Sequence, residues 1–318
     1  MASTASRRRS RLPPGPTVWL SGAIHGDELG GISIICRVMR SLRAKALAGT
    51  VIGVPVVNIF GLLLGTRNLP DLRDLNRSFP GSMKGSLASQ LAHMFVETVV
   101  KRCEFGIDLH TGASGRANLP QIRCDLDEPR AYSTAMAFGV PIAIHAALRD
   151  GSLRATSRKL GIPVLVYEGG EALRLDETSV SVGTRGVFRT LMSLGMIEET
   201  PDFADVPYGD GATKTCRFST WIRSTRGGLA QMEVDLGEFV DQRDVLATIF
   251  DASGNYMIKV RSRVPGLVIG VEREALVHRG RALAHVAVLD RSADAAPNGN
   301  SSSEEGESGK SAGASIPI

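Results

Sequence analysis

A short glycine-rich segment near the start of the chain carries two side chains that could bind a metal ion. His25 and Glu28 lie between an apolar run, residues 17–20, and an amphipathic stretch that predicts a helix. Their offset lets an imidazole and a carboxylate in one turn converge on a single point, and the two groups together suit zinc. A lone His-x-x-Glu pair is a weak signal, so the interpretation depends on residues further along the chain.

His110 is a third candidate ligand, at the end of a strand predicted over residues 104–110. In open α/β sheets, ligands bind beyond the carboxyl ends of the strands, where His25 and Glu28 are also expected. Asp108 shares the face of its strand with His110, so its carboxylate could orient the imidazole ring. Three protein ligands with a fourth position left open are typical of catalytic zinc, and we expect one Zn²⁺ per chain.

Glu168 ends another apolar strand, residues 162–168, directly before two glycines. Because zinc lowers the pKa of bound water to about 7, a carboxylate at this edge could take a proton from that water at neutral pH. Glu171 is an alternative base, but the Tyr-Glu-Gly-Gly context favours Glu168. The other histidines have no partner pattern and are interpreted as structural or exposed: His93, His145, His278 and His285.

The segment of residues 67–81 combines arginines, carboxylates and prolines without a clear period. Such a loop either borders a cleft or is a solvated loop with local ion pairs. Asn76 and Arg77 offer N–H donors suited to a substrate carboxylate, and Arg67 or Arg73 could polarise a carbonyl oxygen. A small anionic substrate is therefore expected, and the formal net charge of +4 is compatible with one.

Composition is that of a globular protein with ample core: 318 residues, 43% of them hydrophobic and 22% charged. No apolar run reaches the roughly 18 residues of a membrane helix. There is no phosphate-binding glycine loop, and the slight basic excess is a weak argument for nucleic acid. We expect a cytoplasmic protein with reduced cysteines and with neither a membrane nor a nucleic-acid partner; a homo-oligomer is left open.

Helical and strand patterns alternate up to about residue 200, which predicts an α/β domain, residues 17–200, with a mostly parallel or mixed sheet flanked by helices. A linker over residues 201–214 precedes short apolar runs that predict a small all-β, barrel-like domain over residues 215–291. The basic leader, residues 1–16, and the Ser/Gly/Glu-rich tail, residues 292–318, are expected to be disordered.

Capping residues mark the ends of several predicted helices. Ser86 or Ser82 would open one helix, and Pro129 and Gly139 would begin and end another. Asp176 would open a long helix that ends before Gly195. The apolar spacing of the first helix predicts that its buried stripe consists of Leu29, Ile32, Ile35, Cys36, Met39 and Leu42.

Four motifs, in order along the chain, resemble the succinylglutamate desuccinylase/aspartoacylase family of the zinc carboxypeptidase fold group. They are Gly26-Asp-Glu28, Asp74-Leu-Asn-Arg77-Ser-Phe-Pro-Gly81, Asp108-Leu-His110-Thr and Glu168-Gly-Gly170. The resemblance spans roughly Val18 to Leu194 and, more loosely, the β domain, which is similar to the barrel-like appendage of that family.

The resemblance implies zinc held by His25, Glu28 and His110, with Glu168 as the general base. It also implies that the substrate carboxylate is held by Asn76 and Arg77. The carbonyl-polarising arginine of the family matches Arg67 best, if two extra residues are allowed before Asp74, and Arg73 is the second choice.

The expected activity is therefore zinc-dependent hydrolysis of an amide, which removes an acyl group from an N-acylated amino acid or a related small amide with a carboxylate. A carboxypeptidase acting on small peptides would use the same metal chemistry. A non-catalytic binding protein on the same scaffold is the alternative from another class, and the presence of the ligand set and of Glu168 argues against it. No motif in the substrate-selecting loops identifies the acyl group or the amine.

Overall fold

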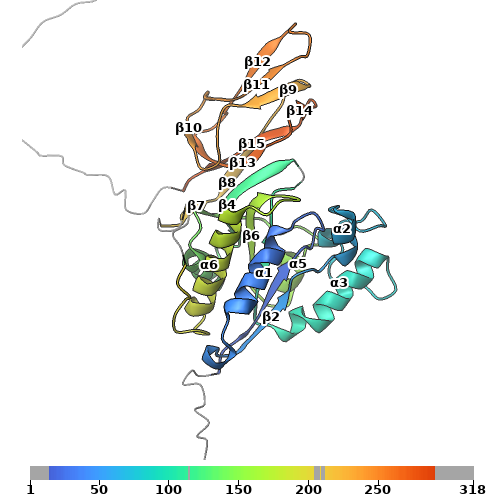
Figure 1. The fold of residues 1–318 in the computed structure, drawn as a ribbon, viewed down its shortest axis with the longest axis vertical. Helices are drawn as coiled ribbons and strands as arrows, with labels where there is room; N and C mark the ends of the chain where they lie inside the picture. Colours follow the sequence, from blue (N-terminus) through green and yellow to red (C-terminus); the bar gives the residue numbers. More distant parts are fainter. Residues whose placement is uncertain (1–13, 114, 204–207, 209–211, 291–318) are drawn as a thin grey trace, which may run out of the picture.

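A computed structural model describes the chain at residues 14–113, 115–203, 208 and 212–290. Within these residues, an 11-stranded sheet runs through the molecule and a 4-stranded sheet packs beside its C-terminal strands. Figure 1 shows the helices gathered around one end of the long sheet and the antiparallel strands at the other. The predicted tail, and the predicted leader up to residue 13, lie outside the described residues.

The centre of the large sheet is parallel. Its strands lie in the order β2 (Thr50–Val54), β1 (Thr17–Gly22), β3 (Phe105–His110) and β6 (Val164–Glu171). Apolar side chains of α1, α4 and α6 cover one face of this sheet, and those of α3 and α5 cover the other. These helices are α1 (Gly30–Ser41), α3 (Leu87–Thr98), α4 (Pro129–Phe138), α5 (Leu153–Lys159) and α6 (Glu177–Ser193). The predicted helix-flanked sheet is confirmed.

The sheet becomes mixed at β4 (Arg116–Cys124), which pairs antiparallel with β6 and parallel with β5 (Ile142–His145). The C-terminal region is all-β, as expected. β13 pairs antiparallel with β4, so β13, β15, β8 and β10 continue the same sheet, whereas β9, β11, β12 and β14 form the 4-stranded sheet. The strands of this region are β7 (Lys214–Cys216), β8 (Phe218–Arg223), β9 (Gly228–Met232), β10 (Phe239–Val240), β11 (Val245–Phe250), β12 (Met257–Arg261), β13 (Gly266–Glu272), β14 (Leu276–Val277) and β15 (Ala282–Val288). The division into two domains therefore stays a prediction.

Helix ends follow the capping signals. Ser86 accepts a hydrogen bond from the Ser89 amide at the start of α3, and α4 begins at Pro129 and ends at a left-handed Gly139. The Asp176 carboxylate caps α6. Short helices connect the longer elements, namely η1 (Ala44–Ala46), α2 (Ile59–Leu64), η2 (Leu75–Arg77) and η3 (Val100–Arg102).

Three local expectations differ from the structure. The sequence pattern indicated neither α2, which is too short to display a period, nor β4, which contains Pro120 and two arginines. The buried face of α1 runs through Gly30, Gly31, Ile34, Ile35 and Val38, so the predicted stripe is only partly correct. Gly31 packs against the Leu109 carbonyl, where a Cβ atom would come within 2.7 Å, so close contact with the sheet rotates the helix away from its larger apolar residues.

Cys36 is accordingly exposed on α1, and it is a free thiol like Cys103, Cys124 and Cys216. Among the helices of the described residues, none combines the length and the apolar character that a membrane span requires.

Candidate active site

The turn between β1 and α1 positions the first two candidate ligands. The Glu28 amide donates a hydrogen bond to the His25 carbonyl at 3.1 Å, which closes the turn, and Ala23 adopts a positive φ of 47° at its start. A Cβ atom on Gly26 would lie 1.9 Å from the backbone carbon of Gly61 in α2. Only glycine fits this contact, so α2 fixes the turn from outside.

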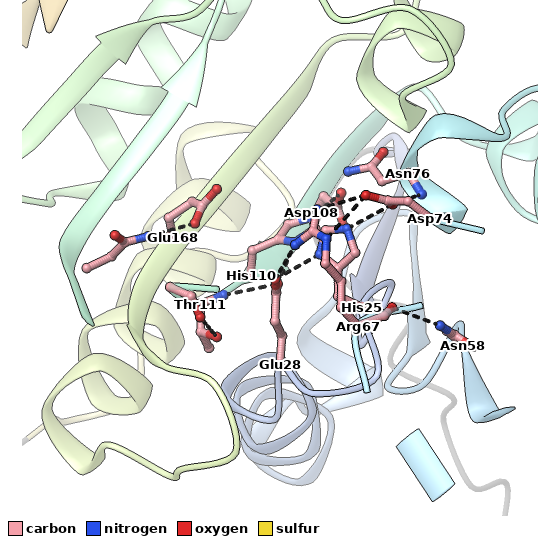
Figure 2. Close-up of polar contacts among 12 residues, drawn as sticks. His25, Glu28, Asn58, Arg67, Asp74, Asn76, Asp108, His110, Thr111 and Glu168 are labelled. Atoms are coloured by element: carbon pink, nitrogen blue, oxygen red, sulfur yellow. Dashed lines mark hydrogen bonds and ion pairs between the residues drawn. The ribbon is translucent and has the colours of Figure 1, made fainter. Parts of the chain in front are cut away.

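The three predicted metal ligands meet at the carboxyl ends of β1 and β3 (Figure 2). His25 Nδ1 lies 2.8 Å from Glu28 Oε1, and His110 Nδ1 lies 2.7 Å from Glu28 Oε2. All three side chains are buried, and one candidate ligand atom from each lies within 4.8 Å of the others. Two imidazoles and a carboxylate at this spacing form a donor set that suits zinc.

Two further carboxylates determine which ring nitrogen of each imidazole carries the hydrogen. Asp108 Oδ2 lies 2.7 Å from His110 Nε2, and Asp108 Oδ1 accepts a hydrogen bond from the Ser21 hydroxyl at 2.8 Å. Asp74 Oδ1 lies 3.2 Å from His25 Nε2. We assign the Nε2 hydrogens as donors to these carboxylates, which leaves both Nδ1 lone pairs free for an ion. The residues present therefore fit a bound zinc ion.

Electrostatics at the cluster favour positive charge at its centre. Burial alone would lower the pKa of both imidazoles, but the charge of Glu28 and the hydrogen bonds to Asp74 and Asp108 outweigh it and raise the pKa of His25 and of His110. Burial would likewise raise the pKa of the Glu28 carboxyl, yet the two imidazolium charges hold that pKa well below its usual range. Protons or a divalent cation could supply this charge.

Of the two candidate arginines for the carbonyl oxygen, only Arg67 lies at the site. Its Nη2 donates to Asp74 Oδ2 at 2.9 Å, and its Nη1 lies 3.4 Å from Glu28 Oε1. The Arg73 side chain is 65% exposed, lies 4.0 Å from Asp71 and does not line the cavity described below. Arg67 is therefore the arginine that a bound carbonyl could reach.

Asn76 and Arg77 both line the cavity from η2. The Asn76 Oδ1 accepts a hydrogen bond from the Leu153 amide at 2.9 Å, which orients the Nδ2 group as a free donor. The Arg77 Nη1 donates to the Asn76 carbonyl at 2.5 Å. Asp74 caps η2 through the Asn76 amide, so one carboxylate supports both a histidine ligand and the donors beside it.

Glu168 lies on β6 directly beside His110 of β3. Asn118 Nδ2 donates to Glu168 Oε2 at 2.9 Å, and Arg123 Nε lies 3.7 Å from Glu168 Oε1. Glu171, the alternative base, instead pairs with two surface arginines and does not line the cavity. The structure thus places Glu168, and not Glu171, within the site.

A cavity of about 460 Å³ is lined by the three candidate ligands and by Asp108, Arg67, Asn76, Arg77 and Glu168. Trp221 and Ser219 of β8 form part of its wall, so the C-terminal strands contribute to the site. Trp221 stacks on His285 with ring centroids 4.5 Å apart, and the Arg116 guanidinium lies over the Trp221 ring. Sequence reasoning missed the residues from β4, β8 and the α5 region that line the cavity: Arg116, Asn118, Arg123, Arg149, Arg154 and Trp221.

His145 also lines the cavity, although the sequence suggested a structural or exposed role. Together with Asp125 and Asp127 it forms a second group with possible ligand atoms within 4.8 Å of one another. Arg158 and Arg217 already pair with these two carboxylates, and the Leu126 amide donates to His145 Nδ1. These contacts leave the group without a free set of ligands.

Known proteins share this architecture. A sequence model described as the succinylglutamate desuccinylase/aspartoacylase catalytic domain matches residues 14–194. The N-alpha-acetyl-L-2,4-diaminobutyric acid deacetylase of Halomonas elongata is 32% identical over 286 residues, which cover 86% of this chain and 82% of that protein.

Two solved structures are similar over most of the chain. The succinylglutamate desuccinylase/aspartoacylase from Rhodobacter sphaeroides has a TM-score of 0.79 and 28% identity, with 87% of each chain covered. The product-bound ectoine utilization protein EutE (DoeB) from Ruegeria pomeroyi has a TM-score of 0.76 and 25% identity, with 86% of each chain covered. The family model matches more than half of this chain, and the chain therefore belongs to the succinylglutamate desuccinylase/aspartoacylase family.

Proposed function

We propose that this chain is a zinc-dependent amide hydrolase that removes the acyl group from a small N-acyl amino acid. One observation carries the proposal: the Nδ1 atoms of His25 and His110 converge on the two oxygens of Glu28, in a cavity that Glu168 also lines. Membership of the family, and a relative named as a deacetylase, support the deacylase class.

The roles of the side chains follow from their positions. When bound, zinc supplies a Lewis acid and lowers the pKa of water to about 7. Glu168, held by Asn118, takes the proton of the attacking water and delivers it to the leaving amine. Arg67 donates to the carbonyl oxygen as that atom becomes negative. Asn76 and Arg77 hold the carboxylate of the amino acid and so keep the amide within reach.

The proposal also includes the cellular location of the protein and the kind of substrate that it binds. Free thiols and a cavity rich in arginine agree with a cytoplasmic enzyme that acts on a small anionic substrate. A carboxypeptidase would place a peptide in the same cavity and use the same base. Only a comparison of substrates therefore distinguishes the two activities.

The test combines a substrate panel with a matched pair of variants. N-acetyl, N-formyl and N-succinyl amino acids would be compared with blocked dipeptides and tripeptides, and we expect the N-acyl amino acids to be cut fastest. Glu168→Gln should lower kcat by about 10²- to 10⁴-fold while zinc content stays unchanged, because the base is lost and no ligand is. Glu171→Gln makes the same change outside the cavity and should leave kcat unchanged.

Faster cleavage of tripeptides than of every N-acyl amino acid would replace the deacylase with a carboxypeptidase. Full activity of Glu168→Gln would show that another group is the base.

A further inference from the structure

We propose that Trp221, on the C-terminal strand β8, positions the base Glu168 by holding the side chain of Asn118 against it. The inference rests on the proposed function, in which Glu168 takes the proton of the attacking water. Trp221 acts through Asn118 and is therefore a positioning residue.

A row of cross-strand partners connects Trp221 to Asn118 across the large sheet. Asn118 of β4 is paired with Gly270 of β13, and Gly270 is paired in turn with His285 of β15. His285 is paired with Trp221 of β8. Asn118 and Trp221 both line the cavity, so they lie on the same face of the sheet. Three strand spacings, about 14 Å, separate the backbones at the two ends of the row, so only long side chains that lie along it could meet.

Gly270 leaves the space in which these two side chains meet. A Cβ atom on Gly270 would lie 3.2 Å from Trp221 Cη2 and 3.2 Å from Asn118 Oδ1. The edge of the indole and the end of the amide therefore converge above the backbone of Gly270, where another residue would place its side chain. A glycine within a strand permits such a close approach, and an aromatic ring on a neighbouring strand can cover it.

The indole ring is itself held by its neighbours. It stacks on the buried His285 ring at a centroid distance of 4.5 Å and an interplanar angle of 14°. The guanidinium carbon of Arg116 lies 5.0 Å from the centroid of the same ring. His285 Nε2 lies 2.9 Å from the Ser219 hydroxyl, which ties the stacked imidazole back to β8. Stacking and the cation–π contact together keep the Trp221 ring in one orientation.

Asn118 needs such support to hold the base. Its Nδ2 donates to Glu168 Oε2 at 2.9 Å, whereas Arg123 Nε lies 3.7 Å from Oε1, an ion pair beyond hydrogen-bond distance. Rotation about the last side-chain bond of an asparagine is soft, so the amide could turn away from Glu168 if nothing contacted its other end. Trp221 lies at that other end, beside Oδ1, and so keeps Nδ2 directed at Glu168.

The first test inserts a methyl group between the two side chains. Gly270 does not line the cavity, so Gly270→Ala would disturb the contact without touching the substrate. We expect kcat of the full chain on its best N-acyl amino acid to fall by about 3- to 10-fold, with KM and zinc content unchanged. Gly227→Ala is the matched control, because its Cβ atom would meet nothing closer than 3.4 Å, and it should keep the wild-type kcat. A wild-type kcat for Gly270→Ala would overturn the proposal.

The second test is a double-mutant cycle on kcat. Trp221→Leu should lower kcat by about 10-fold in the wild type, but by less than about 2-fold when Asn118→Leu is already present, because the residue through which Trp221 acts is gone. Phe218→Leu, an exposed change on the same strand outside the cavity, should leave kcat unaltered in both backgrounds. A loss that merely reflected a weakened structure would be equal in the two backgrounds, and that outcome refutes positioning through Asn118.

A crystal structure of Trp221→Leu separates this inference from the proposed function, because it needs no turnover. We expect the distance from Asn118 Nδ2 to Glu168 Oε2 to exceed 3.5 Å in this variant and to stay near the wild-type 2.9 Å in Phe218→Leu. If no N-acyl amino acid is hydrolysed but this hydrogen bond is lost in Trp221→Leu alone, the deacylase proposal fails and the contact is supported. An intact hydrogen bond in Trp221→Leu overturns the inference, with or without activity.

Discussion

The candidate metal ligands could be found from the sequence because each lies at or just beyond the carboxyl end of a strand of the same parallel sheet. His110 is far from His25 and Glu28 in the chain, yet the neighbouring carboxyl ends of β1 and β3 bring the three together. Asp108 could be predicted as the partner of His110, because residues two apart share one face of a strand. Asp74 could not be assigned to His25, because only the folded loop brings these two residues together.

Loss of a histidine ligand should remove the metal. His110→Ala deletes one of the three candidate ligands, and we expect zinc, about one per chain in the wild type, to be lost on dialysis. Elemental analysis of protein purified without added metal measures this directly. His278→Ala, an exposed histidine distant from the ligand set in sequence, should retain the ion. Equal zinc in both variants would contradict the ligand assignment.

We expect Asn118, which the sequence did not indicate, to position Glu168. Its amide holds Glu168 at 2.9 Å, and Asn118→Leu would keep a similar volume while releasing the carboxylate. We expect kcat to fall by about 10- to 100-fold, because a base displaced by even an ångström transfers protons poorly. Zinc content and KM should change little, and this pattern distinguishes positioning from a structural loss. A normal kcat would show that Glu168 is oriented without Asn118.

At the scale of elements, the helices could be predicted more easily than β4, a strand that lines the cavity. Capping residues are local signals, so the ends of α3, α4 and α6 could be located from the chain alone. The face of β4 lines a polar cavity and therefore carries arginine and asparagine where a buried strand would carry apolar residues. Its Pro120 lies at a register shift between Asn118 and Gln121, so the proline is accommodated where the regular pairing breaks.

The cap of α6 should contribute measurably to stability. The Asp176 carboxylate accepts hydrogen bonds from the amides of Thr178 and Ser179, and α6 packs against both α1 and α4. Asp176→Ala should lower the free energy of unfolding by about 1 kcal/mol, within the range of known N-caps. Urea denaturation followed by circular dichroism measures the change. Asp150→Ala, at an exposed loop position, should stay within about 0.5 kcal/mol of wild type, and an equal loss in both variants would refute the cap.

At the scale of the whole molecule, the C-terminal strands form part of the candidate active site. The all-β character of this region could be predicted from short apolar runs bounded by turn residues, but its attachment could not. Pairing of β13 with β4 is a contact between distant segments, and it leads through β15 to β8, whose Trp221 forms a wall of the cavity. Figure 1 shows this sheet passing continuously from the helical part into the antiparallel strands.

His285 should make this junction sensitive to acid. It is buried on β15, stacks on Trp221 and lies 2.9 Å from the Ser219 hydroxyl. Burial, together with the charges of Arg123 and Arg116, lowers the pKa of His285 to about 3. The unfolded chain, with an ordinary pKa of about 6.5, binds a proton more readily than the folded chain. The stabilisation by neutral His285 is therefore complete above about pH 6.5 and is lost as the pH falls towards 3.

Urea denaturation of wild type and His285→Gln at pH 7.5 and pH 5.0 tests this expectation. Between these values the wild type should lose about 2 kcal/mol more than the variant, because about one and a half pH units separate pH 5.0 from the unfolded pKa. Carboxylates that titrate in the same range affect both proteins equally and cancel in the difference. His278→Gln, an exposed histidine, should show the wild-type dependence on pH. Parallel pH profiles of stability for wild type and His285→Gln would contradict this expectation. They would mean that His285 accepts a proton in the folded protein as easily as in the unfolded chain.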